Sequence, residues 1–294
     1  MGVSRRTILG AIAAGTCAGA TFAHRVLEAA PAPYEVLELE APGRLASRFS
    51  LLVPRHTEPG TELRLLVALH GLGEAHDERV GVRAWLDRYG LGSSYERLLA
   101  PPITPSGRRG EWTAERLAEV NASLAARPFA GLAVACPFTP SLKGVADRRS
   151  ALAEYADWLV EQVVPRACRA ASVPERAASI GLDGCSMGGP YALDTFLRHP
   201  KAFASLGVVQ PAFGLHRVPS YAERLAGALS SSNTRMQLLS SRGDPFVEPT
   251  TALASALEKQ GGSPRLRVLP GPHDQPWLRE AGTIEMLLFH ERGG

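Results

Sequence analysis

Apolar and polar positions alternate near the start of the chain and then give way to continuous apolar runs. Residues 34–40 alternate apolar and acidic side chains, which predicts an edge strand, and residues 48–54 are predicted to be its hairpin partner. The runs 63–69 and 131–136 are apolar at almost every position, as expected of strands that are buried on both faces. The pattern therefore predicts a hairpin that leads into a buried sheet.

Helical spacing alternates with further short apolar runs along the second half of the chain. This order of strand, helix and strand favours an α/β fold with a mainly parallel sheet and helices on both faces. Its active site would lie at the carboxyl ends of the strands. The predicted helices span 147–171, 191–197, 221–229, 248–259 and 276–290, and the predicted strands span 177–182, 203–209, 236–240 and 266–269.

Residues 74–130 show little strand character. We expect helices at 82–89, 95–99 and 114–126, with a break where Pro101, Pro102 and Pro105 cluster. A stretch of this length is often a functional loop or lid, so we interpret it as an insertion that walls the substrate pocket. The domain prediction is an export signal and linker at 1–30, followed by a catalytic domain at 31–294.

The strongest chemical signal is Ser186 in Gly184-x-Ser186-x-Gly188. The motif follows an apolar run and precedes helical spacing, and a nucleophile elbow needs this strand–turn–helix context. Glycines two residues before and after the serine would relieve the crowding of the tight turn. Because glycine makes up 29 of 294 residues, the five-residue motif alone is weak, and its context carries the prediction.

A serine nucleophile needs a base and an acid that orients the base. His273 follows the 266–269 run through a Gly/Pro turn and is the predicted base, whereas His216 is out of chain order. Asp244 follows the 236–240 run and is the predicted acid, with Glu248 and Asp274 as the alternatives. His199, at a helix end, and His290, in the last helix, are expected to lie outside the site.

The predicted oxyanion hole consists of two backbone N–H groups. One belongs to Met187, directly after the serine, and the other to Leu72, in the His70-Gly71-Leu72-Gly73 loop after the 63–69 strand. The His70 side chain is expected to be structural. A metal site built from His70, His76 and Asp77 is the less favoured reading, because these residues lack helix-face spacing.

The beginning of the chain resembles a twin-arginine export signal. Ser4-Arg5-Arg6-Thr7-Ile8-Leu9 precedes an apolar run rich in small residues that extends to Phe22, and no acidic residue occurs before Glu28. An uncleaved membrane anchor is the alternative, although the run is short for a span. We therefore expect an exported protein, periplasmic or extracellular, without a stable membrane span once the leader is removed.

Charge and cysteine content narrow the function classes. With 32 basic and 29 acidic residues, the net charge of +3 gives no case for a nucleic-acid partner. Removal of the leader with Cys17 would leave Cys136, Cys168 and Cys185, so at most one disulfide is expected. The spacing of these cysteines does not suggest a metal site.

Several motifs together resemble the α/β-hydrolase superfamily, and within it the esterase D and feruloyl esterase-like carboxylesterases. They are Leu69-His70-Gly71, Gly184-x-Ser186-Met187-Gly188-Gly189, His199-Pro200-x-x-Phe203, Gly243-Asp244-x-x-Val247 and Gly271-x-His273-Asp274. The resemblance implies hydrolysis of a small-molecule or polymer-linked ester through an acyl-enzyme, without a metal or organic cofactor. Cys185 and residues 74–130 depart from the pattern.

Three hypotheses remain open from the sequence. A secreted serine carboxylesterase is favoured, a peptidase or acyltransferase on the same scaffold is the second, and a non-catalytic binding protein is the third. The substrate and the oligomeric state stay undetermined at this point.

Overall fold

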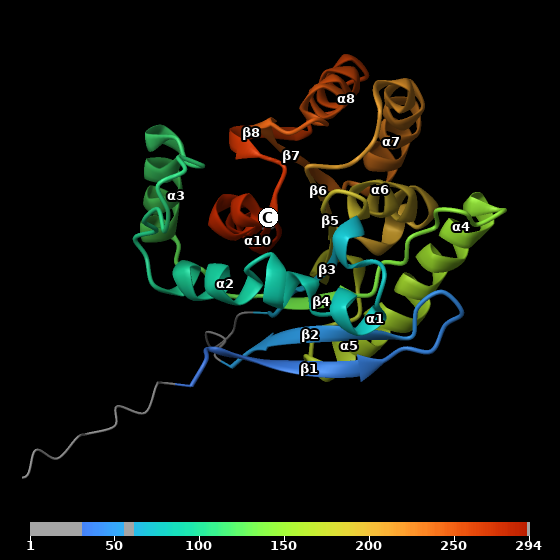
Figure 1. The fold of residues 1–294 in the computed structure, drawn as a ribbon, viewed down its shortest axis with the longest axis horizontal. Coiled ribbons are helices and arrows are strands. Elements are labelled where there is room, and N and C mark those ends of the chain that lie inside the picture. The colour runs from blue at the N-terminus through green and yellow to red at the C-terminus, as the bar shows by residue number, and fades with distance from the viewer. Residues whose placement is uncertain (1–30, 56–61, 293–294) are drawn as a thin grey trace, which may run out of the picture. The chain divides into compact units, whose positions relative to one another are not determined.

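The strands form one eight-stranded sheet in the order β1-β2-β4-β3-β5-β6-β7-β8. In the computed structural model, which describes residues 31–55 and 62–292, the residues from Pro33 onward belong to one compact unit (Figure 1). The strands are Tyr34–Glu40 (β1), Arg48–Pro54 (β2), Leu65–Leu69 (β3), Ala133–Pro137 (β4), Ile180–Gly184 (β5), Ser205–Val209 (β6), Arg235–Gly243 (β7) and Arg265–Pro272 (β8).

The sheet is antiparallel at one edge and parallel elsewhere. Strand β1 pairs antiparallel with β2, and β2 pairs antiparallel with β4. The pairs from β4 through β3, β5, β6 and β7 to β8 are all parallel. The carboxyl ends of six strands therefore meet at one edge of the sheet, where ligands bind in open α/β sheets.

Ten α-helices connect these strands in the described part of the chain. They are Glu78–Gly81 (α1), Leu91–Leu99 (α2), Ala114–Ala126 (α3), Arg148–Trp158 (α4), Val164–Ala170 (α5), Gly188–Arg198 (α6), Val218–Ser232 (α7), Val247–Lys259 (α8), Gln275–Trp277 (α9) and Thr283–Glu291 (α10). Three π-helical segments occur at Ala84–Arg88 (η2), Leu159–Val163 (η3) and Leu278–Gly282 (η7). Short 3₁₀ turns lie at Leu72–Glu74 (η1), Ala177–Ser179 (η4), Pro200–Ala202 (η5) and Leu215–Arg217 (η6).

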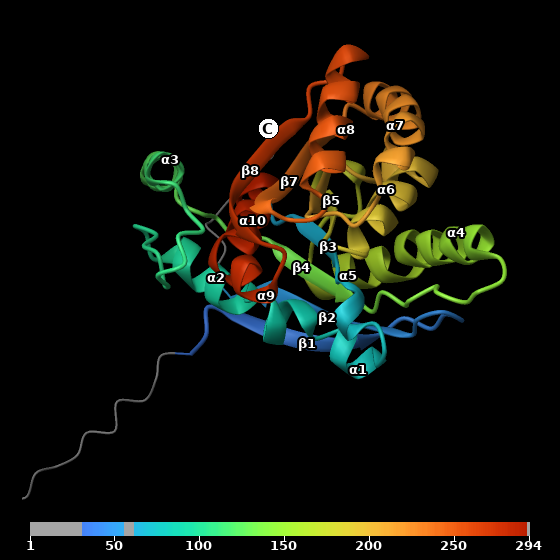
Figure 2. The ribbon, with the colours of Figure 1, turned by 45° about the horizontal axis from the view of Figure 1, so that its top comes forward.

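Both faces of the sheet are covered, as the continuous apolar runs predict. In β3, Leu65, Val67 and Leu69 pack into a core that includes residues of α4–α8, whereas Leu66 and Ala68 pack into a second core with residues of α2, α3 and α10. Figure 2 shows these two groups of helices on opposite sides of the sheet. The predicted α/β architecture is confirmed.

Several predicted elements differ from the observed ones. The helix expected at 276–290 is divided into α9, the π-helical segment η7 and α10, and the strand expected at 177–182 begins as the 3₁₀ turn η4. The helix expected at 82–89 is replaced by α1, which starts earlier because the Asp77 side chain accepts hydrogen bonds from the Arg79 and Val80 N–H groups, and by the π-helical segment η2. The helix expected at 147–171 is helical from α4 to α5 but contains the π-helical segment η3, directly before a turn that begins with Val164 and Pro165.

Residues 74–130 contribute helices α2 and α3 to the fold. Helices α2 and α3 are part of the second core, so they complete the fold rather than cover it as a lid. The turn between them is tied to the C-terminal segment by Glu280, which accepts hydrogen bonds at 3.0 Å from the Arg97 guanidinium and from the Trp112 indole. Arg109 in the same turn binds the Asp274 carboxylate at 2.8 Å, next to His273.

The predicted leader at residues 1–30 lies outside the described residues. Within residues 31–55 and 62–292, the structure contains no helix of the length and apolar character that a bilayer span requires.

Candidate active site

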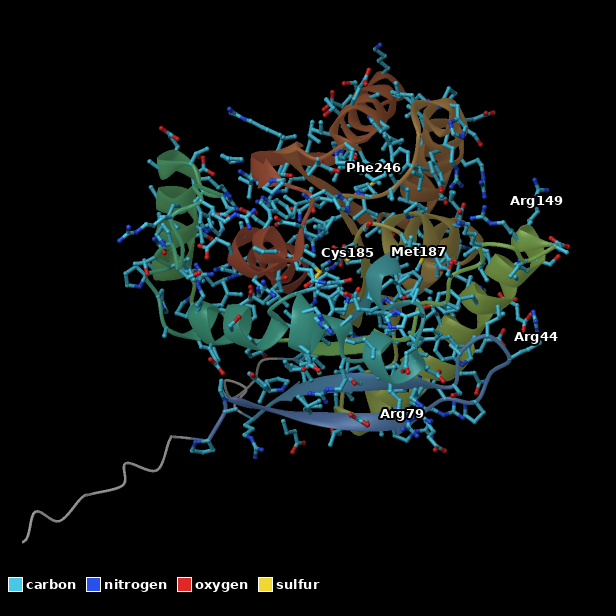
Figure 3. The ribbon with its side chains drawn as sticks, in the orientation of Figure 1. Arg44, Arg79, Arg149, Cys185, Met187 and Phe246 are labelled. Atoms are coloured by element: carbon cyan, nitrogen blue, oxygen red, sulfur yellow. The ribbon has the colours of Figure 1, made fainter. Side chains whose placement is uncertain are left out.

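Ser186 occupies a sharp turn between β5 and α6. Its backbone has a φ of +52°, a left-handed conformation that is uncommon for a residue with a side chain. A Cβ on Gly184 would overlap the Gly188 carbonyl, and a Cβ on Gly188 would lie 2.6 Å from the Leu69 carbonyl oxygen. Only glycine therefore fits two residues before and two residues after this serine. The residues that flank it, Cys185 and Met187, are labelled in Figure 3.

The imidazole of His273 bridges Ser186 and Asp244. Its Nε2 lies 3.0 Å from Ser186 Oγ, and its Nδ1 lies 2.9 Å from Asp244 Oδ1. Asp244 follows the last residue of β7, and His273 follows the last residue of β8. Three side chains from three separate strand ends thus form one continuous hydrogen-bonded row.

Asp244 is held in an acceptor role. It is 3% exposed, its Oδ2 accepts from Ser240 Oγ at 2.6 Å, and its Oδ1 also accepts from the Phe246 N–H at 2.9 Å. The Phe246 ring, labelled in Figure 3, meets the His273 ring edge-on at 5.6 Å between centroids. These contacts leave Nδ1–H of His273 as the donor to Asp244 and Nε2 as the acceptor for the serine proton.

Gln210 fixes the loop that carries His273. Its side-chain amide donates to Ser241 Oγ at 2.7 Å and to the Pro272 carbonyl oxygen at 3.0 Å. Its backbone has a φ of +47°, and its side chain is almost fully buried. No motif in the sequence marked this residue, because both of its partners come from distant strand ends.

The two alternative acids, Asp274 and Glu248, form no hydrogen bond with the His273 imidazole among the described residues. Asp274 binds Arg109 and accepts from the Trp277 N–H at 2.9 Å, so it caps α9. Glu248 lies in the first turn of α8, and no hydrogen bond joins it to the imidazole among the described residues. Among the three predicted acids, only Asp244 contacts His273.

The loop after β3 approaches the serine closely. A Cβ on Gly71 would lie 3.3 Å from Ser186 Cβ, so the backbone passes directly beside the serine. In residues 31–55 and 62–292, the N–H groups of Leu72 and Met187 donate to no protein acceptor. The Leu72 side chain is 59% exposed. Both predicted oxyanion donors are thus backbone groups without an internal hydrogen-bond acceptor among the described residues.

Solved structures of similar fold were found, although neither a protein-family model nor a curated protein sequence matches this chain. A ferulic acid esterase is 15% identical with a TM-score of 0.65, and the match covers 89% of this chain and 99% of that one. S-formylglutathione hydrolase from Staphylococcus aureus is 15% identical with a TM-score of 0.58, covering 88% and 98% of the two chains. A feruloyl esterase module from Clostridium thermocellum is 13% identical with a TM-score of 0.57, covering 91% and 92%.

The chain has the α/β-hydrolase fold. Its parallel strands, the Ser186 elbow and the similar structures agree on this assignment. The resemblance that the sequence motifs predicted is confirmed for the fold, and the names of these proteins match the esterase groups to which the motifs pointed.

Within this α/β-hydrolase fold, His70 is a structural residue. It is fully buried, its Nδ1 lies 2.8 Å from the Gly71 carbonyl oxygen, and its Nε2 accepts from the Thr139 N–H at 2.8 Å. Burial lowers the pKa of His70 to about 4, so the ring is neutral near pH 7. His70 therefore joins the loop after β3 to the loop after β4, in line with its predicted role.

The metal reading finds no support in this geometry. His76 Nδ1 lies 3.0 Å from the Gly73 carbonyl oxygen, and Asp77 caps α1. No group of three or more metal-binding side chains gathers within the described ranges. The three described cysteines, Cys136, Cys168 and Cys185, are free and buried.

His199 and His216 lie outside the Ser186 site. His199 is the C-cap of α6, and its Nε2 lies 2.7 Å from Asp157 Oδ1, which agrees with its expected place at a helix end. His216 lies in the short turn η6.

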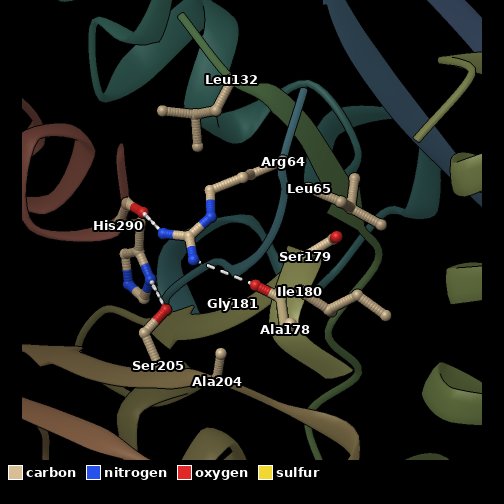
Figure 4. Close-up of a pocket in the computed structure, with 10 residues that line it drawn as sticks. All are labelled: Arg64, Leu65, Leu132, Ala178, Ser179, Ile180, Gly181, Ala204, Ser205 and His290. Carbon is tan, nitrogen blue, oxygen red and sulfur yellow. Dashed lines mark hydrogen bonds between the residues drawn. The ribbon is translucent and has the colours of Figure 1, made fainter. Parts of the chain in front are cut away.

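His290 forms a second Ser–His–Asp set, which sequence reasoning missed. Its Nδ1 lies 2.7 Å from Ser205 Oγ, and its Nε2 lies 3.0 Å from Asp183 Oδ2. All three side chains are buried. Figure 4 shows Ser205 and His290 beside a cavity of about 10 Å³, the size of one water molecule. Arg64 closes this cavity by donating to the carbonyl oxygens of His290 and Ala178.

Proposed function

We propose that this protein is a serine hydrolase that cleaves carboxylic esters through an acyl-enzyme intermediate. The observation that carries the proposal is the position of the His273 imidazole, 3.0 Å from the Ser186 hydroxyl and 2.9 Å from the Asp244 carboxylate. The left-handed turn at Ser186 supports it, because backbone strain of this kind gathers at functional sites.

Acylation begins at the Ser186 hydroxyl. As Oγ attacks the ester carbonyl carbon, its proton moves to Nε2 of His273, and Asp244 stabilises the imidazolium that forms. The carbonyl oxygen becomes an oxyanion and accepts hydrogen bonds from the N–H groups of Met187 and Leu72. When the tetrahedral intermediate collapses, His273 gives its proton to the departing alcohol. The acyl group then remains bonded to Ser186 Oγ.

Deacylation repeats the sequence with water. His273 takes a proton from a water molecule, which attacks the acyl carbon, and the carboxylic acid leaves as Oγ is reprotonated. The 25% exposure of the His273 side chain gives water access to Nε2. The N-terminal end of α6 also faces this region, and its positive dipole end favours the oxyanion. Each oxyanion donor is worth about 3 kcal/mol of barrier.

The substrate class that we propose is a small-molecule or polymer-linked carboxylic ester. The exposed Leu72 side chain and the Phe246 ring against His273 supply apolar surface on two sides of the serine. The ferulic acid esterase of similar fold supports an ester rather than a peptide.

A fluorophosphonate probe tests this proposal. The folded wild-type protein is expected to be labelled, and Ser186→Ala is expected to lose the label completely, because the probe phosphonylates an activated serine. Ser205→Ala is the matched control, since it removes the buried serine of the second Ser–His–Asp set, and it should be labelled like the wild type. An unlabelled wild-type protein that is folded by circular dichroism would contradict the proposal.

We also propose that the protein is exported through a twin-arginine-like signal. The support is the Ser4-Arg5-Arg6-Thr7-Ile8-Leu9 motif and the small-residue run that follows it. The small-residue sites Ala18-Gly19-Ala20 and Thr21-Phe22-Ala23 predict cleavage, so mass spectrometry of protein from the producing cell is expected to find a mature N-terminus at Thr21 or His24. A chain that still begins at Met1 would overturn this proposal and leave the enzymatic one intact.

A further inference from the structure

A buried carboxylate joins the two loops on either side of Ser186. Glu74, the last residue of η1, is 4% exposed. Its Oε2 accepts a hydrogen bond from the Tyr89 hydroxyl, and its Oε1 accepts one from the Gln275 side-chain amide at 2.9 Å. Glu74 belongs to the loop after β3, whereas Gln275 lies two residues beyond His273. The carboxylate therefore connects the Leu72 loop to the His273 loop.

The Tyr89 hydroxyl also holds the backbone beside the serine. It accepts a hydrogen bond from the Gly71 N–H at 3.1 Å. A Cβ on Gly71 would lie 3.2 Å from this hydroxyl and 3.3 Å from Ser186 Cβ, so Gly71 lies close to both groups. The phenol oxygen thus holds the Gly71 N–H, one residue before the Leu72 N–H.

Tyr89 itself is firmly placed and stays protonated. Its carbonyl oxygen accepts from Thr283 Oγ1 at 2.7 Å, and its ring packs edge-on against Trp85 at 5.1 Å between centroids. Burial raises the pKa of the Tyr89 phenol, and the nearby Cys185 and Glu74 raise it further. The phenol therefore keeps its proton and remains a donor to Glu74 while it accepts from Gly71.

We propose that Glu74 and Tyr89 are positioning residues that hold the Leu72 N–H in register with Ser186 and His273. This inference rests on the proposed function, because it concerns the oxyanion of that reaction. Neither residue contacts the reacting atoms in this account. Their bonds fix the distance between the loop that stabilises the oxyanion and the loop that carries the base. A displacement of about 1 Å in such a site can lower a rate about a hundredfold.

Removal of the single phenol oxygen is the first test. Tyr89→Phe is expected to lower kcat for a chromogenic ester about 10- to 100-fold, while KM changes less than about threefold, because the loss falls on the transition state. The control is Tyr95→Phe. Tyr95 is also fully buried, and its hydroxyl lies 3.3 Å from the Leu132 carbonyl oxygen and accepts from the Leu132 N–H at 3.1 Å. This variant should lose thermal stability but keep kcat.

An exchange of side chains across the bridge is the second test. Gln275→Glu places a second carboxylate opposite the Glu74 carboxylate, so the bond between the two side chains is lost and kcat is expected to fall about tenfold. The double variant Glu74→Gln/Gln275→Glu restores a donor opposite an acceptor while the amide oxygen at position 74 still accepts from Tyr89. It should recover most of the lost kcat. If the bridge only stabilised the fold, the single and the double variant would have the same kcat whenever their melting temperatures were equal.

The outcomes separate this inference from the proposed function. If the wild type neither hydrolyses esters nor reacts with the fluorophosphonate, the function fails and the bridge has no reaction to serve. If the wild type is active and a folded Tyr89→Phe variant has the same kcat, only the positioning role is overturned. A double variant that is no better than Gln275→Glu would also overturn it.

Discussion

Two Ser–His–Asp sets lie in the described part of this chain, and they differ in how far they are exposed. Ser186, His273 and Asp244 meet at the carboxyl ends of the parallel strands, where the His273 side chain is 25% exposed. In the other set, the His290 side chain is 2% exposed and closed in by core residues. The same three residue types thus lie at the candidate active site in one place and within the core in the other.

The local backbone separates the two serines further. Ser186 sits in a left-handed turn beside a glycine-rich loop, whereas Ser205 is the first residue of a regular strand, β6. His273 presents Nε2 to its serine, whereas His290 presents Nδ1. Under the proposed function, a hydrogen-bonded row of serine, histidine and aspartate needs two further features, namely access for the ester and free N–H groups beside the hydroxyl.

The buried set also differs in its protonation. Burial raises the pKa of Asp183 and lowers the pKa of His290, so both groups favour their neutral forms. Asp244 instead accepts hydrogen bonds from three donors, namely His273, Ser240 and the Phe246 N–H. The first set can hold a developing imidazolium, and the second set is suited to joining β5, β6 and α10.

The largest expected contrast comes from the two aspartates. Asp244→Asn is expected to lower kcat about 10⁴-fold, because the amide would hold His273 in the wrong tautomer. Asp183→Asn should change kcat less than tenfold and should lower the free energy of unfolding by about 1–2 kcal/mol through a poorer bond to His290. Ester kinetics and urea unfolding of both variants measure the difference.

Asp274→Asn is the control for the neighbourhood of His273. Its carboxylate binds Arg109 and caps α9, so we expect a loss in kcat of less than tenfold. Should Asp274→Asn or Asp183→Asn lose as much activity as Asp244→Asn, the assignment of the orienting acid would have to change.

A smaller expected effect is the pH dependence of stability that His70 causes. The pKa of buried His70 is lowered to about 4, below the value of about 6.5 in an unfolded chain. Its contribution to stability is therefore present above pH 6.5 and is lost as the pH falls toward 4. The maximum loss is about 3 kcal/mol. His290 and Asp183 shift in opposite directions, so their contributions oppose each other as the pH falls.

Urea unfolding between pH 7 and pH 4.5 checks this expectation. His70→Gln should flatten the pH dependence in this window, whereas the same change at the exposed His76 should leave it as in the wild type. Equal pH dependence in wild type and His70→Gln would show that another group carries the acid sensitivity.

Much of the fold could be predicted because apolar runs and caps are local signals. The hairpin of β1 and β2 and the helix α3 have the predicted bounds. The helix expected at 82–89 was misplaced because the capping role of Asp77 was overlooked. Strands β7 and β8 extend beyond their predicted ends to the residues directly before Asp244 and His273. Polar residues there masked the strand pattern.

The candidate site also has parts that could be predicted from the sequence and parts that could not. Ser186, Asp244 and His273 follow strands in the order that the fold requires, so their meeting at one edge could be expected, while their chemical roles stay predictions. The partners around them could not be read from the sequence. Glu74 and Gln275 are 201 residues apart, and Asp183 and His290 are 107 residues apart. Such pairs depend on how whole strands and helices are stacked.

The last segment of the chain has a consequence for biosynthesis. Helix α10 brings His290 to Asp183 and Glu285 to Arg116, and the loop before it brings His273 to Ser186. A ribosome-bound chain that has emerged only to residue 260 therefore lacks both the base and the closing helix of the second core. Such a nascent protein is expected to stay incompletely folded until residues 273–291 have left the exit tunnel. Under the proposed function, ester cleavage would then begin only after these residues have joined the fold.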